Sequence, residues 1–272
     1  MTAQIAVVRF LWRRHRFLLV LVVVWGAAVA WLFSWMASLS DLREGITKLI
    51  KVLPPLWQRK ISPDVMVLLD PTGAMTMAFE HPMMMAPFLL WAMLLPLRHI
   101  ATEQERGLLD IILARRIARS EWLAGIAFWS VAGLLTIAAV VSAAFIASAS
   151  YFPQLANVKS GSLVQIAFMQ AAWSFAVSGV AAALAARTGR FRFSLGATVA
   201  FVLFMMFGEV ICRYLAGAKR FAVFSLWYWT DPINLYLGKV KPASAVAVLL
   251  LTAIAAWTVA FVWFSKRDLA AR

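Results

Sequence analysis

The sequence predicts an all-α integral membrane protein with six transmembrane helices. Hydrophobic residues make up 63% of the chain, charged residues only 14%, and the mean hydropathy is +0.82. Ordinary soluble domains are only about 45–50% apolar. The apolar residues also stand in long uninterrupted runs, as they do in membrane spans. Because no soluble core of this size could bury so much apolar surface, we predict a single transmembrane domain over residues 1–272.

Six apolar runs are long enough to cross a bilayer. A spanning helix needs roughly 20 residues, because only then do its backbone groups bond to one another throughout the hydrocarbon layer. The predicted spans cover residues 17–37, 82–100, 122–150, 163–186, 195–215 and 245–264. The first run is too long for the core of a signal peptide, so we expect it to be retained.

The formal net charge of +14 comes from Lys and Arg clusters that flank these runs, which indicates membrane lipids and not nucleic acid as the partner. Four short segments are densest in positive charge. They carry Arg9, Arg13, Arg14 and Arg16; Arg98, Arg106, Arg115, Arg116 and Arg119; Arg187, Arg190 and Arg192; and Lys266, Arg267 and Arg272. Since Lys and Arg resist translocation, we expect these segments and both termini in the cytoplasm. The predicted location is the plasma membrane, in a bacterium the inner membrane.

Three segments outside the spans have a helical or interfacial pattern. Residues 1–16 place Ile5, Val8 and Trp12 at helical spacing beside a basic face, which predicts an N-terminal interfacial helix. The periodicity of residues 42–53 predicts a short surface helix in the long first outer loop. The aromatic residues of 221–237 predict a segment packed at the edge of the outer leaflet.

The common catalytic motifs are missing from the sequence. It contains no Gly-rich nucleotide-binding loop with Lys, no Gly-x-Ser-x-Gly elbow and no His-Glu-x-x-His motif. His15, His81 and His99 stand near predicted span ends on differing sides, so we expect surface or interface histidines and no metal site. Cys212 is expected to be a free buried thiol. We therefore predict no catalytic residues and no cofactor in this chain.

The most informative segment is the predicted cytoplasmic loop of residues 101–113, Ala-Thr-Glu-Gln-Glu-Arg-Gly-Leu-Leu-Asp-Ile-Ile-Leu. Acidic residues at the start of a short helix interact favourably with its dipole. A compact charged helix that projects from a membrane domain is suited to docking a soluble partner. A simple solvated loop is the alternative.

This segment resembles the one that follows the second span in ABC-2 type ABC-transporter permeases. The resemblance rests on Glu103-x-Glu105-Arg106-Gly107, then on an Asp-Ile-Ile run, an Arg and a Gly. These last residues are Asp110, Ile111, Ile112, Arg119 and Gly125. The ending Phe264-Ser265-Lys266-Arg267-Asp268-Leu269 is similar to the family's exit from its last span. Leu108, Arg116 and Ile126 depart from the Thr, Pro and Lys that are usual there.

The resemblance implies a permease that pairs with a second permease copy or paralogue and with two separate ATP-binding subunits. ATP and magnesium would be bound by those subunits and not by this chain. Residues 103–113 would form the coupling helix that sits in a cleft of the ATPase. Glu103, Glu105 and Arg106 are expected to make charged contacts there, Gly107 to permit the bend, and Asp110 to belong to the same helix.

The implied function is export of a hydrophobic or amphipathic substrate, and five residues are candidates for its pathway. Glu209 and Arg213 are four residues apart in the fifth span, so they share a helix face. They form either a pathway pair or an ion pair that reaches the headgroups. Met84, Phe88 and Met205 are suited to a surface that repacks around apolar cargo, or they simply fill the core. A secondary transporter or channel that uses Glu209 and Arg213 directly is the alternative function.

Overall fold

In the computed structural model, residues 3–39, 69–114, 117–215 and 218–266 are described, together with positions 44, 45, 48, 52 and 67. The regular structure in these ranges is helical and includes no strand. Six helices of this part are long and apolar enough to cross a membrane, which confirms the predicted number of such helices. They cover Ile5–Ser38, Pro82–Glu105, Arg119–Tyr151, Ser160–Thr188, Phe191–Cys212 and Pro242–Lys266.

Five of these spans lie within single helices. These are α1 (Ala3–Ser38), α9 (Arg119–Tyr151), α10 (Ser160–Thr188), α11 (Phe191–Tyr214) and α14 (Pro242–Lys266). The second span is composite, since it runs through α6 (Pro82–Pro96), the π-helical segment η2 (Leu97–Thr102) and α7 (Glu103–Glu105). The sequence predicts that this span ends at residue 100, and the helix that continues to Glu105 corrects that boundary.

The change of helix type follows Pro96. Proline has no N–H to donate and its ring crowds the preceding turn, so a helix that contains it must rearrange its hydrogen bonds locally. Pro87 and Pro96 both lie within α6, and the wider π-helical turns begin directly after the second proline. Short π-helical stretches often occur at functional sites. The π-helical stretch η2 leads directly into residues 103–113, for which the sequence predicts a docking helix.

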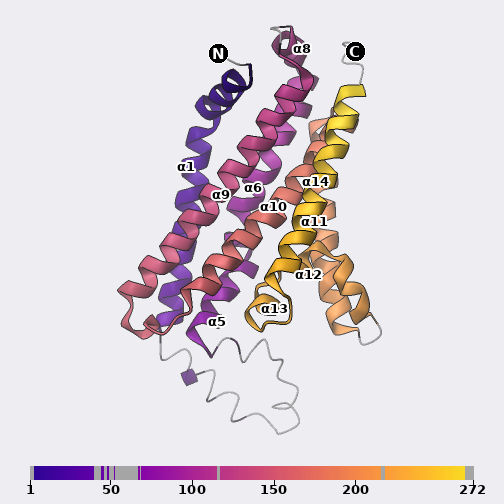
Figure 1. The fold of residues 1–272 in the computed structure, drawn as a ribbon. Helices are drawn as coiled ribbons and strands as arrows, with labels where there is room; N and C mark the ends of the chain where they lie inside the picture. Colours follow the sequence, from indigo (N-terminus) through magenta and orange to yellow (C-terminus); the bar gives the residue numbers. More distant parts are fainter. Residues whose placement is uncertain are drawn as a thin grey trace.

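The helices form one bundle whose ends differ. Figure 1 shows both termini and α8 (Leu108–Leu113) at one end, and α5 (Pro71–Thr76) and α13 (Pro232–Tyr236) at the other. An even number of spans requires the two termini to share an end. The described basic residues of all four predicted cytoplasmic segments therefore lie at the end that carries α8.

The central helix of the bundle is α10. In the most apolar stretch of α10, 78% of the residues are buried within the chain. The corresponding share for α11 is 17%, so most of α11 faces outward. Small residues bring the helices close together. At Gly133 of α9, a Cβ atom would stand 2.1 Å from the indole of Trp91, so only glycine leaves room for this fully buried ring of α6.

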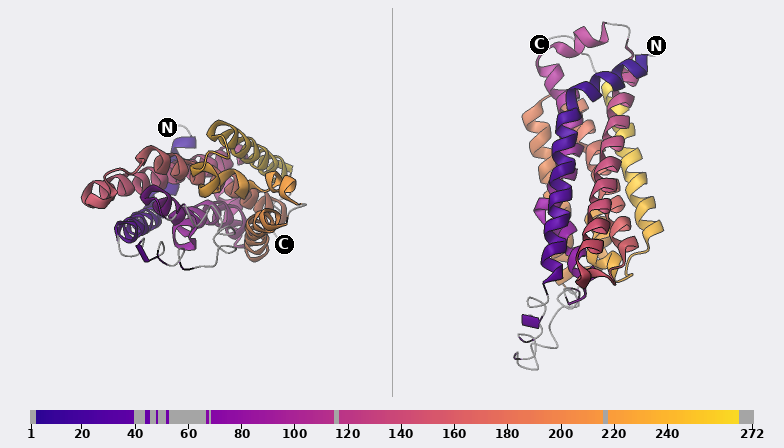
Figure 2. Two further views of the ribbon diagram at one scale, coloured as in Figure 1. Left: turned by 90° about the horizontal axis from the view of Figure 1, so that it is seen from below. Right: turned by 90° about the vertical axis from the view of Figure 1, so that its left-hand side faces the viewer.

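The predicted interfacial helix is continuous with the first span. Residues 3–16 belong to α1, and Figure 2 shows that these first turns are inclined to the long shaft of the helix. Val7 and Leu11 are buried, whereas Ile5 and Trp12 are 54% and 47% exposed. Val7 and Leu11 therefore pack into the bundle, while Ile5 and Trp12, two residues of the predicted interfacial face, point away from it.

The opposite end of the bundle contains short helices where we expected loops. They are α5, η1 (Met77–Glu80), η3 (Pro153–Leu155), η4 (Lys219–Phe224), α12 (Leu226–Thr230) and α13. Ser225 Oγ donates to the carbonyl oxygen of Met205 at 2.6 Å, which holds the start of α12 against α11 well inside that span. Trp227 is only 4% exposed and packs on Trp173, so it belongs to the core and not to an outer aromatic belt.

A polar contact also joins the helices at this end. Tyr236 O–H donates to Asp70 Oδ2 at 2.6 Å, and burial together with this carboxylate raises the pKa of Tyr236 to about 12. The phenol therefore keeps its proton at physiological pH. The surface helix expected at residues 42–53 lies largely outside the described residues.

Candidate coupling site between the second and third spans

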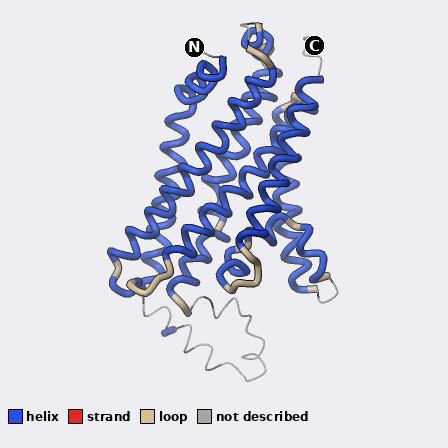
Figure 3. The backbone as a smooth tube through the Cα atoms, in the orientation of Figure 1, coloured by secondary structure: helices blue, strands red, loops and turns tan. Residues whose placement is uncertain are grey.

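The segment between the second and third spans is a short broken helix that projects at one end of the bundle. α7 ends at Glu105, a turn follows, and α8 begins at Leu108; Figure 3 shows this break between the two helical pieces. Gly107 has φ of 65° and ψ of 10°, a left-handed conformation in which a side chain costs about 1 kcal/mol or more. The predicted bend at Gly107 is thus present, and it divides the predicted helix of residues 103–113 into two.

Glu103 lies inside the bundle and not on its surface. Its side chain is 2% exposed, and its Oε1 lies 2.7 Å from Nη1 of Arg14 in α1. A buried carboxylate needs such a partner because removing it from water is costly. Arg14 is 27% exposed, so this pair fixes α7 to α1 while the guanidinium still reaches the surface.

Two histidines extend this buried polar cluster. Nε2 of His15 and Nε2 of His99 are 2.6 Å apart, and the two rings are 1% and 0% exposed. One ring nitrogen must carry the shared proton and the other must accept it. Nδ1 of His99 lies 3.8 Å from Glu103 Oε1, and the backbone oxygen of His99 accepts from Trp122 Nε1 at 3.1 Å.

The histidines are the part of this cluster that sequence reasoning missed. We expected surface or interface positions for them, but His15 and His99 are buried at the same end of the bundle. The signal available in the sequence was that both stand beside an arginine at a span end that the positive-inside rule places on the same side. His81 lies apart from them, where its Nδ1 accepts from Met83 N at the start of α6.

Glu105 connects the same segment to another span. Its Oε1 accepts a hydrogen bond from the backbone N–H of Phe191 at 2.8 Å, in the first turn of α11. The first N–H groups of a helix have no partner within the helix, and a carboxylate there also interacts favourably with the helix dipole. α7 is therefore fixed to α1 by Glu103 and to α11 by Glu105.

α8 presents an apolar and charged outer face. Leu109 is buried, while Arg106, Gly107 and Asp110 are exposed. Leu108 and Ile111 are apolar, yet they are 38% and 59% exposed. Exposed apolar residues with charged neighbours are typical of surfaces that bind another protein.

The five pathway candidates do not form one cluster. Met84 and Phe88 are fully buried in the larger apolar core, whereas Met205 packs on a second apolar cluster near Trp173 and Trp227. The structure therefore supports the core-filling alternative for Met84 and Phe88. Glu209 is 2% exposed on α11, and the side chain of Arg213 lies outside the described residues.

A group of buried polar atoms in α10 was not anticipated. Gln170 is 1% exposed, and neither its Oε1 nor its Nε2 finds a hydrogen-bond partner among the described residues. The same holds for Trp173 Nε1 and Ser174 Oγ, one turn further along the central helix. Such atoms carry an uncompensated desolvation cost.

Comparison with protein-family models and with curated proteins finds no match for this chain. The functional interpretation therefore depends on the geometry of the molecule and on the sequence motifs.

Proposed function

We propose that this chain is the transmembrane permease subunit of an ATP-driven exporter of the ABC-2 type. The observation that carries the proposal is the position of α8. This helix stands at the end of a six-span bundle with Leu108 and Ile111 exposed, while the adjoining α7 is held by Glu103 and Glu105 to two different spans. A force applied to α8 would reach α1 and α11 through these two carboxylates.

The buried position of Glu103 changes which residues meet the partner. Arg106, Asp110 and Ile111 are exposed, so in this proposal they contact the ATP-binding subunit. Glu103 and Glu105 act as positioning residues, because their carboxylates are engaged within the chain. Gly107 permits the bend between the two parts. The exported substrate is hydrophobic or amphipathic, a second permease completes the pathway, and two ATP-binding subunits supply the energy.

The test is co-purification of the tagged chain from its native membrane, followed by measurement of ATP hydrolysis. We expect an ATP-binding subunit in about equal amount, with vanadate-sensitive ATPase activity. Ile111→Glu should remove the subunit and the activity, because a charge would then be buried in the apolar part of the contact. Leu237→Glu is the matched control, since Leu237 is also apolar and 38% exposed but follows α13 at the opposite end.

Two results would contradict this function. One is a chain that purifies without any ATP-binding subunit and still transports after reconstitution. The other is equal loss of the subunit in Ile111→Glu and Leu237→Glu.

A second candidate function is secondary transport through Glu209. The burial of this carboxylate in α11, the span with the least buried apolar stretch, favours it, since ionisable residues within spans commonly mark ion or proton pathways. In this case the reconstituted chain alone should transport in response to a proton gradient. Glu209→Gln should abolish that transport, whereas Ile111→Glu should not affect it.

A further inference from the structure

An apolar groove lies where the inclined start of α1 crosses the first turns of α9. Its volume is about 690 Å³, within the range of about 300–1,000 Å³ that is usual for ligand pockets. The lining residues are Ile5, Val8, Arg9, Trp12, Ala124, Gly125, Phe128 and Trp129. Arg9 is the charged member of this set, and the others are apolar or aromatic.

The floor of the groove depends on a close approach of the two helices. A Cβ atom on Gly125 would stand 2.5 Å from Cγ1 of Val7, so this glycine allows α1 to lie directly on α9. On either side of that contact, Ile5 and Phe128 remain 54% and 58% exposed. The contact between the helices therefore leaves an open apolar channel beside it.

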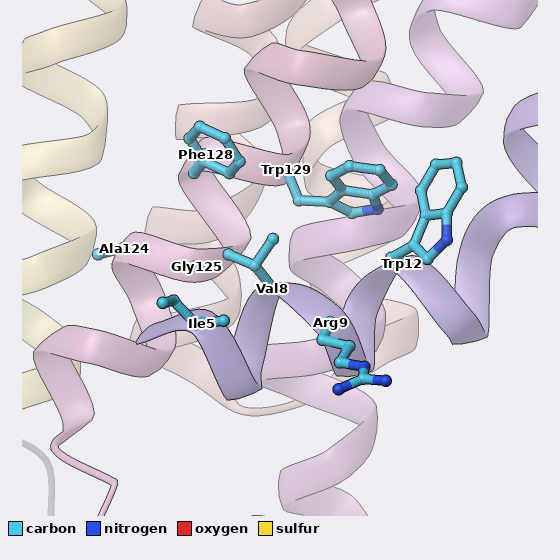
Figure 4. A pocket seen from close by; sticks show the side chains of 8 residues that line it. All are labelled: Ile5, Val8, Arg9, Trp12, Ala124, Gly125, Phe128 and Trp129. Atoms are coloured by element: carbon cyan, nitrogen blue, oxygen red, sulfur yellow. The ribbon is translucent and has the colours of Figure 1, made fainter. Parts of the chain in front are cut away.

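The groove runs inward from the end of the bundle. α9 begins at Arg119, so Ala124 and Phe128 lie about 8 and 14 Å further along its axis. Figure 4 shows the Arg9 side chain at one edge of the groove, with its guanidinium directed away from Phe128. A molecule that lies in the groove would thus meet a positive charge at one edge and apolar side chains further in.

Trp129 adds a polar donor to the apolar part. Its ring is 8% exposed, and its Nε1 finds no hydrogen-bond acceptor among the described residues. Trp12 packs edge to face against Trp129, and the centroids of the two rings are 5.4 Å apart. The π face of a ring is a much weaker hydrogen-bond acceptor than a carbonyl oxygen. Trp12 is 47% exposed, and an oxygen atom would reach the Trp129 N–H if the Trp12 side chain turned aside.

We propose that this groove is a binding site for an anionic glycerophospholipid of the leaflet on the α8 side. One acyl chain lies along Val8 and Phe128, an ester carbonyl oxygen accepts from Trp129 Nε1, and Arg9 pairs with the anionic headgroup. Charge complementarity selects this occupant, because the same end of the bundle also carries Arg13 and Arg16 as exposed residues. An exposed basic residue near an anionic bilayer surface favours binding by about fivefold.

The charge part of the proposal is tested by native mass spectrometry of the delipidated full chain. The protein is titrated with dioleoylphosphatidylglycerol and, separately, with dioleoylphosphatidylcholine. We expect the first lipid to bind about fivefold more tightly to the wild-type chain. Arg9→Gln should remove this preference. Arg192→Gln should keep it, since Arg192 is exposed at the start of α11 at the same end of the bundle but does not line the groove.

The apolar part is tested by filling the groove. Val8→Trp should weaken the binding of both lipids about tenfold, and Ala124→Leu, a smaller change, should weaken both by a few-fold. Circular dichroism and gel filtration establish that each variant is folded. If gel filtration shows that Val8→Trp separates two copies of the chain while lipid binding is unchanged, the groove is an interface between copies and the proposal is wrong.

The ester contact has its own test. A dialkyl-ether phosphatidylglycerol has no carbonyl oxygens, so it should bind the wild-type chain a few-fold more weakly than the ester lipid. Trp129→Phe should weaken the ester lipid by the same factor and leave the ether lipid unchanged. Equal loss of preference in Arg9→Gln and Arg192→Gln, or equal effects of Trp129→Phe on both lipids, would overturn the assignment of the site.

Discussion

Glu103 has a different role at the residue scale from the one that its sequence neighbourhood suggests. Glu103 belongs to an acidic segment that the sequence predicts to be exposed, yet its carboxylate is buried. It pairs with Arg14, which is 89 residues earlier in the chain. Burial without a partner would be costly for either ion. The pair therefore acts as a fixed joint between α7 and α1, and its contribution to stability is separable from any contact with a partner protein.

Glu103→Gln should lower the free energy of unfolding by about 1–3 kcal/mol. Removal of one member of a buried pair costs about 3–5 kcal/mol, and the partial exposure of Arg14 reduces that value. Thermal unfolding in detergent measures the effect. Asp110→Asn, the neutralisation of an exposed carboxylate on α8, should leave the midpoint unchanged. A shift of the same size in both variants would contradict a structural role for Glu103.

Substitution of Gln170, unlike that of Glu103, should raise the stability of the fold. The Gln170 amide is buried in the central helix and makes no hydrogen bond to a described residue. Replacing an unsatisfied buried polar group by an apolar one of similar shape removes a desolvation cost of about 1–3 kcal/mol. Gln170→Leu should therefore raise the thermal midpoint. A lower midpoint would show that the amide has a hydrogen-bond partner in the folded protein, such as a bound water.

The element scale separates what the sequence could predict from what it could not. A run of about 20 apolar residues can be recognised in the sequence without any knowledge of tertiary contacts, so all six spans were predictable. The bend at Gly107 was also predictable, since glycine commonly occupies left-handed positions. In contrast, the packing of Trp227 into the core depends on Trp173, which is far away in the sequence. The same is true of the joint between Arg14 and Glu103, which no local periodicity encodes.

The contact between α6 and α9 depends on one glycine, which gives a prediction at this scale. Gly133→Ala would place a methyl group 2.1 Å from the rigid, fully buried indole of Trp91, and this ring also donates from Nε1 to the carbonyl oxygen of Ser130. Overpacking of this kind costs about 1–3 kcal/mol. We therefore expect a lower thermal midpoint for Gly133→Ala.

Gly196→Ala is the matched control for this substitution. Gly196 is also inside a span, in α11, but its added methyl group would meet nothing within 4 Å. The midpoint should be unchanged or slightly higher, because alanine is favoured in helices by about 1 kcal/mol over glycine. Equal thermal midpoints for Gly133→Ala and Gly196→Ala would contradict the close packing of Trp91 on α9.

At the scale of the whole molecule, the two ends of the bundle differ in charge and in the elements they carry. Both termini and α8 share one end (Figure 1), and most of the described basic residues belong to the segments at that end. The described basic residues of that end are Arg9, Arg13, Arg14, Arg16, Arg98, Arg106, Arg119, Arg187, Arg190, Arg192 and Lys266. The described basic residues of the other end are fewer, namely Lys48, Lys159, Arg220, Lys239 and Lys241. This asymmetry predicts an orientation, because short basic segments stay in the cytoplasm.

Cysteine labelling of whole cells tests this orientation directly. In a Cys212→Ala background, Asp110→Cys on α8 and Gln154→Cys on η3 each introduce one exposed thiol, at opposite ends of the bundle. A membrane-impermeant maleimide should label Gln154→Cys on intact cells and should label Asp110→Cys only after the membrane is permeabilised. Labelling of Asp110→Cys from outside would place α8 beyond the reach of a cytoplasmic ATPase. That result would exclude the proposed coupling and leave the six-span fold intact, since the fold depends on the apolar spans and not on their direction of insertion.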